Sequence, residues 1–220
     1  MKRSLPFVIV GAVALITFGG GALIYRNRLA ALRAGPQTLT PAAVAELGHV
    51  RGNVKAPVTI EEFGDFQCPP CGILSGDLQQ IEKNYGPRLR VIFRQYPLAM
   101  HNHALEAALA SEAAGLQDHF WEMHDLLYRE QAVWSKVPDA VSLFHGYAGA
   151  LGLDLERFKK DFQGPEAKAR VAVDQKRAAA LGVNSTPTLF LNGARVDFPS
   201  MNVAGLRKLI DEPASPKPSP

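Results

Sequence analysis

The chain has only two cysteines in 220 residues, and they stand three positions apart in the motif Cys68-Pro69-Pro70-Cys71. This spacing suits one turn at the start of a helix, where both sulfur atoms can meet. A helix N-terminus carries unsatisfied N–H groups equivalent to about half a positive charge, which stabilises a thiolate. The motif therefore predicts a redox-active dithiol at a strand-to-helix turn.

The segments around this motif predict the elements that hold it. Residues 58–63 form an apolar run that is typical of a buried strand, and residues 72–85 have the pattern of a helix. Residues 89–95 predict a second strand. Residues 188–191 predict a third, which the turn Asn192-Gly193 joins to a fourth as a hairpin.

Between the second and third strands the chain becomes rich in Ala, Leu and Glu at helical spacing. The sequence predicts helices over 104–114, 119–129, 140–151, 155–162 and 165–181, and a closing helix over 203–210. This order predicts an α/β protein with a thioredoxin fold, whose mixed central sheet is interrupted by an all-helical insertion. We expect the first two strands to be parallel and the last two to be antiparallel.

These elements divide the chain into six predicted segments, two of which are halves of one thioredoxin core. The segments are a transmembrane signal anchor (1–25), a linker (26–50), the first half of the core (51–100), the helical insertion (101–164), the second half of the core (165–211) and a disordered tail (212–220). The tail is expected to be disordered because four of its nine residues are proline.

The N-terminal segment contains a run of 20 residues without charge, from Leu5 to Ile24. At about 1.5 Å per residue, a helix of this length spans a hydrocarbon core of about 30 Å. The run predicts an uncleaved membrane anchor, because the apolar core of a signal peptide usually has about 7–15 residues. Cleavage is the alternative, since Gly20-Gly21-Ala22 offers small residues at a processing site. Basic residues flank both ends in nearly equal number, so charge does not decide the orientation.

The formal net charge of +3 arises in this N-terminal segment. Residues 1–35 hold five of the 24 basic side chains and no acidic one, which leaves 19 basic and 21 acidic residues in the rest of the chain. A slight acidic excess is not typical of a protein that binds the phosphate backbone. We therefore expect no nucleic-acid partner.

The two cysteines are expected to have unequal roles. The prolines between them stiffen the turn and remove two backbone donors, but the N–H of Cys71 remains available to the Cys68 sulfur. We expect Cys68, at the end of the helix, to be the exposed nucleophile. Cys71, one turn deeper, would then resolve the mixed disulfide.

A CxxC pair can also form half of a zinc site, but zinc usually needs a second pair of thiols or imidazoles. His101 and His103 are the only compact candidates, and their spacing suits a loop rather than a known finger pattern. We therefore predict a redox site without a metal or a cofactor. Together with His119 and His124, these histidines are expected to be cap or partly buried helix residues.

Glu62 is an acid within an otherwise apolar strand. It is either a solvent-facing edge residue or a buried carboxyl near Cys71 that has a raised pKa and relays the proton of that thiol. We predict the buried relay. Glu61 points to the opposite face of the strand and is expected to be solvated.

Proline also precedes the third strand, in Ser185-Thr186-Pro187-Thr188. By itself such a proline often marks a strand edge or a first strand residue. Beside a CxxC motif, a cis Thr186–Pro187 bond would instead form a shelf next to the cysteines and expose the Thr186 backbone to a client chain. We expect Thr186, Pro187, Pro69 and Pro70 to contact the substrate.

Four groups of residues together carry a family resemblance: 62–71, then 96–98 with 101–104, then Gly115 with 120–124, and 181–188. This combination resembles the DsbA-like thiol:disulfide oxidoreductases of bacteria, especially their membrane-anchored branch, over about residues 52–211. The resemblance implies a thioredoxin fold with a helical insertion. It also implies Cys68 as the nucleophile, Cys71 as its partner, Glu62 as the buried acid and Pro187 as the cis-proline. The dipeptide between the cysteines departs from the best-known oxidases, which carry a His next to the second cysteine.

The predicted function is an extracytoplasmic dithiol–disulfide oxidoreductase that oxidises cysteine pairs of secreted or envelope proteins through a mixed disulfide. The resemblance implies a quinone-linked membrane thiol oxidase as reoxidant, or a membrane reductant if the enzyme is a reductase. We expect a single-pass protein of the bacterial cytoplasmic membrane with its catalytic domain outside, or a secreted protein after signal cleavage. The alternatives are a reductase or isomerase of the same fold, and a copper-delivery or assembly module that uses the thiols as ligands.

Overall fold

The structure is a computed structural model that describes residues 48–212. Within that range no helix is both long and apolar enough to cross a membrane. The predicted anchor (1–25), most of the predicted linker (26–50) and nearly all of the predicted tail (212–220) lie outside the described residues.

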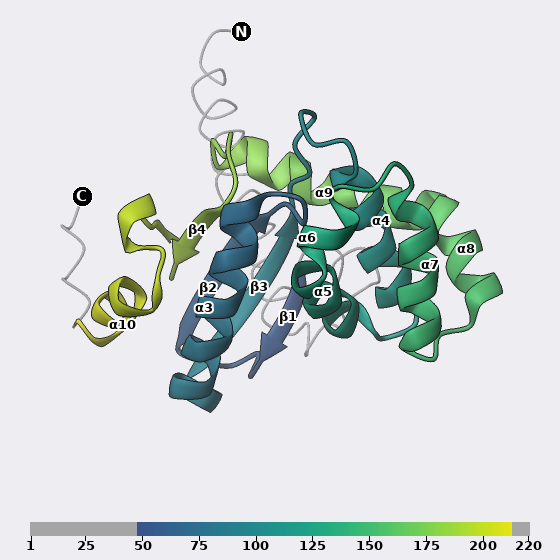
Figure 1. Ribbon diagram of the computed structural model, residues 1–220. Coiled ribbons are helices and arrows are strands. Elements are labelled where there is room, and N and C mark those ends of the chain that lie inside the picture. The colour runs from purple at the N-terminus through teal and green to yellow at the C-terminus, as the bar shows by residue number, and fades with distance from the viewer. Residues whose placement is uncertain (1–47, 213–220) are drawn as a thin grey trace, which may run out of the picture. The chain divides into compact units, whose positions relative to one another are not determined.

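The described elements follow the order that the sequence predicts, with two additions besides the short 3-10 helices η1 and η2. They are β1 (His49–Gly52), β2 (Val58–Gly64), α3 (Pro69–Tyr85), η1 (Gly86–Arg88), β3 (Leu89–Gln95), α4 (Ala104–Gly115), α5 (Phe120–Arg129), α6 (Gln131–Trp134), α7 (Ala140–Ala150), α8 (Leu155–Gln163), α9 (Pro165–Ala180), β4 (Thr188–Leu191), β5 (Ala194–Arg195), η2 (Phe198–Ser200) and α10 (Val203–Asp211). The additions are β1 and α6, each of four residues. The predicted thioredoxin fold with a helical insertion is confirmed (Figure 1).

Within residues 48–212, five strands form one mixed sheet in the order β1-β3-β2-β4-β5. The first two predicted strands, β2 and β3, are parallel, and β4 and β5 are antiparallel, as expected. Asn192 and Gly193 turn the chain between β4 and β5 with φ of 48° and 82°, which is the left-handed geometry of a two-residue hairpin turn. Strand β2 is therefore central in the sheet, and Glu62 is not an edge residue.

Strand β1 was not predicted, because four residues that include His49 and Arg51 do not show a clear apolar alternation. It pairs antiparallel with β3, and its side chains are held by distant partners. His49 Nε2 lies 2.9 Å from Glu112 Oε2, and Arg51 Nη2 donates to Asp125 Oδ1 at 2.7 Å. The strand thus depends on contacts with α4 and α5 that sequence pattern does not reveal.

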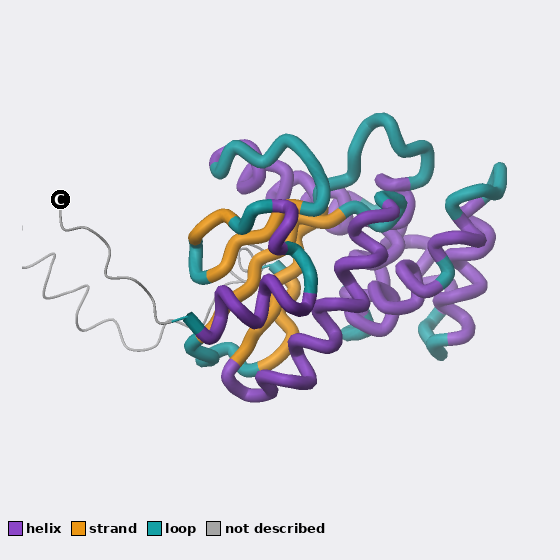
Figure 2. The backbone as a smooth tube through the Cα atoms, turned by 60° about the vertical axis from the view of Figure 1, so that its left-hand side comes forward, coloured by secondary structure: helices purple, strands orange, loops and turns teal. Residues whose placement is uncertain are grey.

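The two faces of β2 are covered by different helices. Ile60 and Glu62 face α3, where Ile60 packs in one apolar cluster with Leu74, Leu78 and Ile81 of that helix. The other face is covered by α9, so the strands lie between helices (Figure 2). Because side chains alternate along the strand, neighbouring residues of β2 are buried on opposite faces of the sheet, one under α3 and the other under α9.

The expectation that Glu61 is solvated was wrong. Its side chain does point away from Glu62, but α9 covers that face, and Glu61 is only 7% exposed. Its carboxylate accepts from Arg177 Nε at 2.6 Å and from Arg94 Nε at 2.9 Å. Burial raises the pKa of Glu61, but the two guanidinium groups outweigh burial, so the pKa lies below its usual value.

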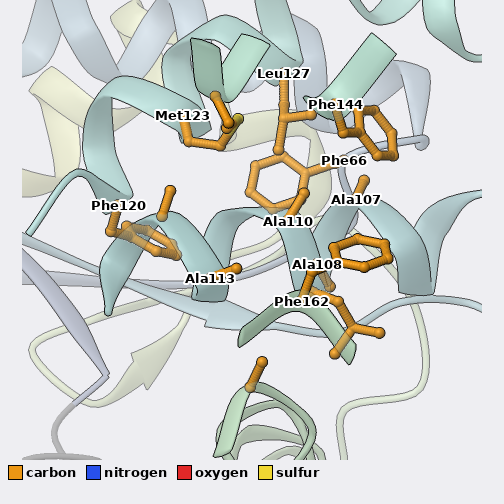
Figure 3. Close-up of a cluster of buried hydrophobic side chains, with 14 of the residues drawn as sticks. Phe66, Ala107, Ala108, Ala110, Ala113, Phe120, Met123, Leu127, Phe144 and Phe162 are labelled. Carbon is orange, nitrogen blue, oxygen red and sulfur yellow. The ribbon is translucent and has the colours of Figure 1, made fainter. Parts of the chain in front are cut away.

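The helical insertion packs around α4, whose alanines let neighbouring helices approach closely. Ala107, Ala108, Ala110 and Ala113 are all buried in one cluster with large side chains from the other helices (Figure 3). Phe66 belongs to this cluster although it precedes the cysteine motif in the chain. The insertion core therefore anchors the turn that carries the dithiol.

We predict that Gly64→Ala destabilises the fold, because a Cβ there would lie 2.5 Å from Phe93 Cε2 and 3.0 Å from the Tyr128 hydroxyl. Overpacking of this kind costs about 1–3 kcal/mol, which urea unfolding will measure. Gly76→Ala in α3 is the control, because a Cβ there meets nothing within 4 Å. Replacing this helix-interior glycine should add about 0.5–1 kcal/mol of stability. Equal stability of the two variants would contradict the packing described around Gly64.

Candidate active site

The dithiol turn begins at Cys68, which caps α3 with an extended backbone (φ −74°, ψ 118°). The carbonyl of Cys68 accepts from the backbone N–H of Cys71 at 3.1 Å and of Gly72 at 3.3 Å, so the helix starts at once. The two prolines occupy the first helical positions, where an N–H has no intrahelical acceptor in any case. Gln131 of α6 donates to the carbonyls of Phe66 at 2.7 Å and Cys68 at 2.9 Å, which ties the turn to the insertion.

Both cysteines are free thiols in this structure, which is therefore the reduced form. Cys71 is fully buried, and Cys68 is 5% exposed. The expected order of exposure holds, but the expectation of an exposed Cys68 was wrong. The Thr186 carbonyl, 3.5 Å from the Cys68 sulfur, accepts a hydrogen bond from the thiol and helps to cover it.

The surroundings separate the pKa values of the two thiols in opposite directions. A hydrogen bond from the Cys71 thiol is the largest cause that lowers the pKa of Cys68, to about 6, with further help from the Thr186 hydroxyl and the Cys71 backbone N–H. Burial raises the pKa of Cys71 well above 9, and its hydrogen bond to Cys68 and the nearby Glu62 add to this. Near neutral pH, Cys68 therefore carries the thiolate and Cys71 keeps its proton.

The Thr186–Pro187 peptide bond is cis, as the sequence analysis predicted. Pro187 is buried and Thr186 is half-buried beside Cys68. Among the described residues the Thr186 hydroxyl has no hydrogen-bond partner at ordinary distance, yet it lies close enough to Cys68 to lower the pKa of that thiol. The loop before β4 thus supplies both a carbonyl and a hydroxyl to the reactive sulfur.

Glu62 is buried on the α3 side of β2, with 1% of its surface exposed. Burial, together with the negative charges of Cys68 and Glu82, raises the pKa of Glu62 to about 8. The predicted buried carboxyl with a raised pKa is therefore confirmed. Its role as a proton relay for Cys71 stays a prediction.

Sequence reasoning assigned no role to Asp65, which organises the loop before the cysteines. Asp65 Oδ1 accepts from the Gln67 N–H at 2.7 Å, and Oδ2 accepts from the Leu98 N–H at 2.9 Å and lies 2.7 Å from His101 Nδ1. The backbone carbonyl of Asp65 accepts from the Cys68 N–H at 3.1 Å. The available signal was an Asp three residues before a turn cysteine, which is typical of an Asx turn.

The histidines that could have completed a metal site do not gather at the cysteines. His101 pairs with Asp65, while His103 pairs with Glu106 at 2.8 Å and with the Val137 carbonyl at 3.0 Å. The part of the chain from 48 to 212 contains no group of three or more His, Cys, Asp or Glu side chains that could hold a metal ion. His103 and His119 precede α4 and α5 at the cap position, as expected.

Residues 45–212 match the family model described as thioredoxin. The chain belongs to the thioredoxin family. It is similar to a thioredoxin-like oxidoreductase from Silicibacter pomeroyi, at 26% identity and a TM-score of 0.63, over 81% of this chain and 96% of that one. It is also similar to oxidised BdbD from Bacillus subtilis, at 25% identity and a TM-score of 0.61, over 73% of this chain and 89% of that one. Wolbachia pipientis α-DsbA1, at 19% identity and a TM-score of 0.62 over 74% of this chain and 88% of that one, shares the fold.

The first of these solved structures is a thioredoxin-like oxidoreductase, and the family match extends the thioredoxin assignment over residues 45–212 of this chain. The DsbA-like resemblance in the sequence is therefore confirmed at the level of the family. The arrangement of Cys68, Cys71 and the cis-proline is consistent with that chemistry.

Relatives with higher identity are much longer proteins. The Na⁺/H⁺ antiporter NhaA 1 of Mycolicibacterium gilvum is 41% identical over 155 residues, which is 68% of this chain and 24% of the antiporter. The protein of the same name from Mycolicibacterium vanbaalenii is 40% identical over 152 residues, 67% of this chain and 24% of its own length. The chain therefore spans about a quarter of the length of these relatives.

We predict that iodoacetamide modifies the two thiols with different pH profiles. The rate at Cys68 should rise with a midpoint near pH 6, whereas Cys71 should stay unreactive until well above pH 9. Thr186→Val should move the Cys68 midpoint upward by roughly 0.5–1 pH unit, the equivalent of one hydrogen bond of about 1 kcal/mol. Mass spectrometry of the alkylated peptides measures both rates, and equal rates at neutral pH would contradict the assignment.

We also predict an effect of Glu62 on the pH dependence of stability. The pKa of Glu62 is about 8 in the folded protein and about 4.3 in an unfolded chain. Between these values the folded state keeps a proton that the unfolded state releases, so this group makes stability fall as pH rises. Glu62→Gln removes the effect, and its stability relative to the wild type should increase from pH 5 to pH 8 in urea unfolding of the reduced proteins.

Glu61→Gln is the matched control for this experiment, because the same change is made one residue away on the other face of β2. The pKa of Glu61 is lowered, so its contribution is present at neutral pH and is lost in acid. Glu61→Gln should cost about 3 kcal/mol at pH 7, because it leaves buried Arg94 with one charged partner fewer. A parallel pH response of the two variants would show that Glu62 titrates normally.

Proposed function

We propose that this enzyme is an extracytoplasmic oxidase that introduces disulfides into secreted or envelope proteins. The observation that carries the proposal is the lowered pKa of Cys68, about 6, beside a buried Cys71 thiol that donates to it. A stabilised thiolate favours the reduced enzyme over its disulfide. The disulfide form is then the less stable one, so transfer of its S–S bond to a client is favourable.

In the proposed reaction, a client thiolate attacks the Cys68 sulfur of the oxidised enzyme. A new S–S bond joins the client to Cys68, and the Cys68–Cys71 bond breaks. Cys71 keeps the electron pair of that bond and takes a proton, which we assign to the Glu62 carboxyl. The second client thiolate then attacks the client sulfur of the mixed disulfide and expels Cys68 as a thiolate. The client loses two electrons, and the enzyme gains them.

Client binding is proposed at the surface where the dithiol turn meets the cis-proline loop. Pro69 and Pro70, which directly follow Cys68, are exposed, and Thr186 is half-buried next to Cys68. The Thr186 carbonyl lies 3.5 Å from the Cys68 sulfur, so an extended client strand beside residue 186 would bring its own cysteine to Cys68. Pro69, Pro70 and Thr186, with Pro187, are the proposed substrate contacts.

A place at the membrane is proposed from two observations. The uncharged run from Leu5 to Ile24 is long enough to anchor the chain. Relatives named as Na⁺/H⁺ antiporters share a segment with this chain, which supports a membrane location for that segment. A quinone-linked membrane thiol oxidase is the proposed reoxidant, because the oxidase must return two electrons to an acceptor after each turnover.

Equilibration of the reduced and oxidised enzyme with glutathione tests the direction of catalysis. We expect a reduction potential above that of thioredoxin, about −270 mV, and below that of the strongest oxidases, about −120 mV. With Cys71→Ser, mixed disulfides with a reduced client should accumulate through Cys68. Cys68→Ser is the control and should abolish these adducts. A potential at or below that of thioredoxin would replace the proposed oxidase with a reductase.

A further inference from the structure

A small cavity lies behind the dithiol, on the side of Glu62 away from the client-facing surface. Its volume is about 10 Å³, and its walls come from β1, β2, β3, α3 and α5. The polar or charged side chains in these walls are Arg51, Glu62, Ser75, Gln79, Glu82 and His124. This is about the smallest space that holds one water molecule, and the wall offers the two to four polar partners that a buried water needs.

Two buried polar atoms on this wall lack a hydrogen-bond partner among residues 48–212. They are Glu62 Oε1 and His124 Nε2. Glu62 is 1% exposed and His124 is 4% exposed. A buried polar atom without a partner costs about 1–3 kcal/mol, so two of them on one cavity indicate a shared partner. A single water between the carboxyl and the imidazole would satisfy both.

The His124 ring is held in a fixed orientation by aromatic neighbours. Its centroid lies 4.8 Å from that of Phe93, 4.9 Å from that of Trp121 and 5.0 Å from that of Tyr128, each in an edge-on arrangement. The same ring lines the cavity, and its Nε2 is the nitrogen without a partner in the described residues. Its other nitrogen, Nδ1, points out of the aromatic cage.

The Nδ1 side of His124 leads to solvent. Nδ1 lies 2.8 Å from Asp125 Oδ1, and the Asp125 side chain is 35% exposed. Arg51 holds this carboxylate at 2.7 Å and also pairs with Glu82 at 3.5 Å. The imidazole thus joins the cavity on one side to a partly exposed carboxylate on the other.

We propose that His124 carries protons between Glu62 and solvent, through one water in the cavity and through Asp125. A proton enters the ring at one nitrogen for each proton that leaves at the other, so no charge accumulates. During client oxidation the proton moves inward, from solvent to Glu62 and on to the Cys71 sulfur. During the reverse reaction it moves outward. This inference rests on the proposed dithiol exchange, and His124 acts through Glu62 without touching either sulfur.

Cys71 needs this supply because its pKa is well above 9, which makes its bare thiolate a poor leaving group. In the mixed disulfide the client covers the face of the enzyme that carries Cys68. A proton must therefore reach Glu62 from another side. The path through His124 runs between α3 and α5, two helices in contact with each other (Figure 1).

The protonation states suit this task. The titratable or charged groups around His124 and the cavity are His49 and Arg51 of β1, Glu62 of β2, Glu82 of α3, and Asp125 and Tyr128 of α5. Burial is the largest cause and lowers the pKa of His124. The hydrogen bond and the charge of Asp125 oppose this, and the smaller effects of Arg51 and His49 lower the pKa further. The imidazole is then neutral near pH 7 while Glu62, with its pKa of about 8, is protonated.

The test compares His124→Gln with His145→Gln. His145 of α7 is the matched control, because its Nε2 is also buried without a partner in the described residues but it packs against Phe158 and Phe162 in the insertion. Stopped-flow mixing of each oxidised protein with a reduced dithiol peptide measures the rate from pH 6 to pH 9, in H₂O and in D₂O. We expect His124→Gln to react roughly tenfold slower or more at pH 7. Its solvent isotope effect should be larger, and its rate should depend more steeply on pH.

Two further measurements separate proton transfer from a structural effect. The Cys68 alkylation profile of His124→Gln should match the wild type, because that profile reports the first sulfur only. Asp125→Asn, at the partly exposed outlet, should show the same larger isotope effect and tests the path even if His124→Gln does not fold. Wild-type rates and isotope effects in the folded variants would overturn the inference, as would equal slowing by His145→Gln. A wild-type protein without any dithiol exchange would instead overturn the proposed function itself.

Discussion

The hydrogen bond from the Cys71 thiol to the Cys68 sulfur is the interaction on which the site depends. It stabilises a thiolate on Cys68 and keeps the proton on Cys71, so the pKa values of two identical groups move apart. The Pro-Pro dipeptide makes this possible by starting α3 directly at the cysteines while withholding its own donors. The thiolate therefore relies on Cys71 and Thr186 for its stabilisation more than on the free N–H groups of a helix end.

The rest of the molecule keeps these sulfurs in place. The Asp65 carboxylate accepts hydrogen bonds from backbone N–H groups in the loops that follow β2 and β3. Gln131 donates to the carbonyls of Phe66 and Cys68 at the turn. Phe66 extends the same turn into the aromatic and alanine core of the insertion. The helical insertion is thus part of the active-site support, because the turn has polar and apolar attachments to it within a few residues of Cys68.

Local patterns in the sequence predicted most elements and many site residues. Contacts between segments that are distant in the chain could not be predicted from such patterns. The strand at 188–191 and the Asn192-Gly193 turn are where the pattern places them, because both depend on short-range backbone preferences. Strand β1 and helix α6 were missed since each has four residues held by tertiary contacts. The cover over Cys68 was also missed, because it comes from the Thr186 carbonyl, more than a hundred residues away in the chain.

Glu61 and Glu62 show why a neutral imidazole suits the proposed proton path better than a cation. Both carboxyls are buried, but Glu61 meets two guanidinium groups and its pKa falls, whereas Glu62 has no such partner in the described region and its pKa rises to about 8. A lysine or arginine on the cavity wall, free to face Glu62, would hold that carboxyl ionised and end its exchange of protons with Cys71. Arg51, the cation on that wall, is instead engaged by Asp125 and Glu82. A neutral ring at His124 can accept or release a proton without fixing the charge of Glu62, so the choice of a histidine there preserves the raised pKa on which the relay depends.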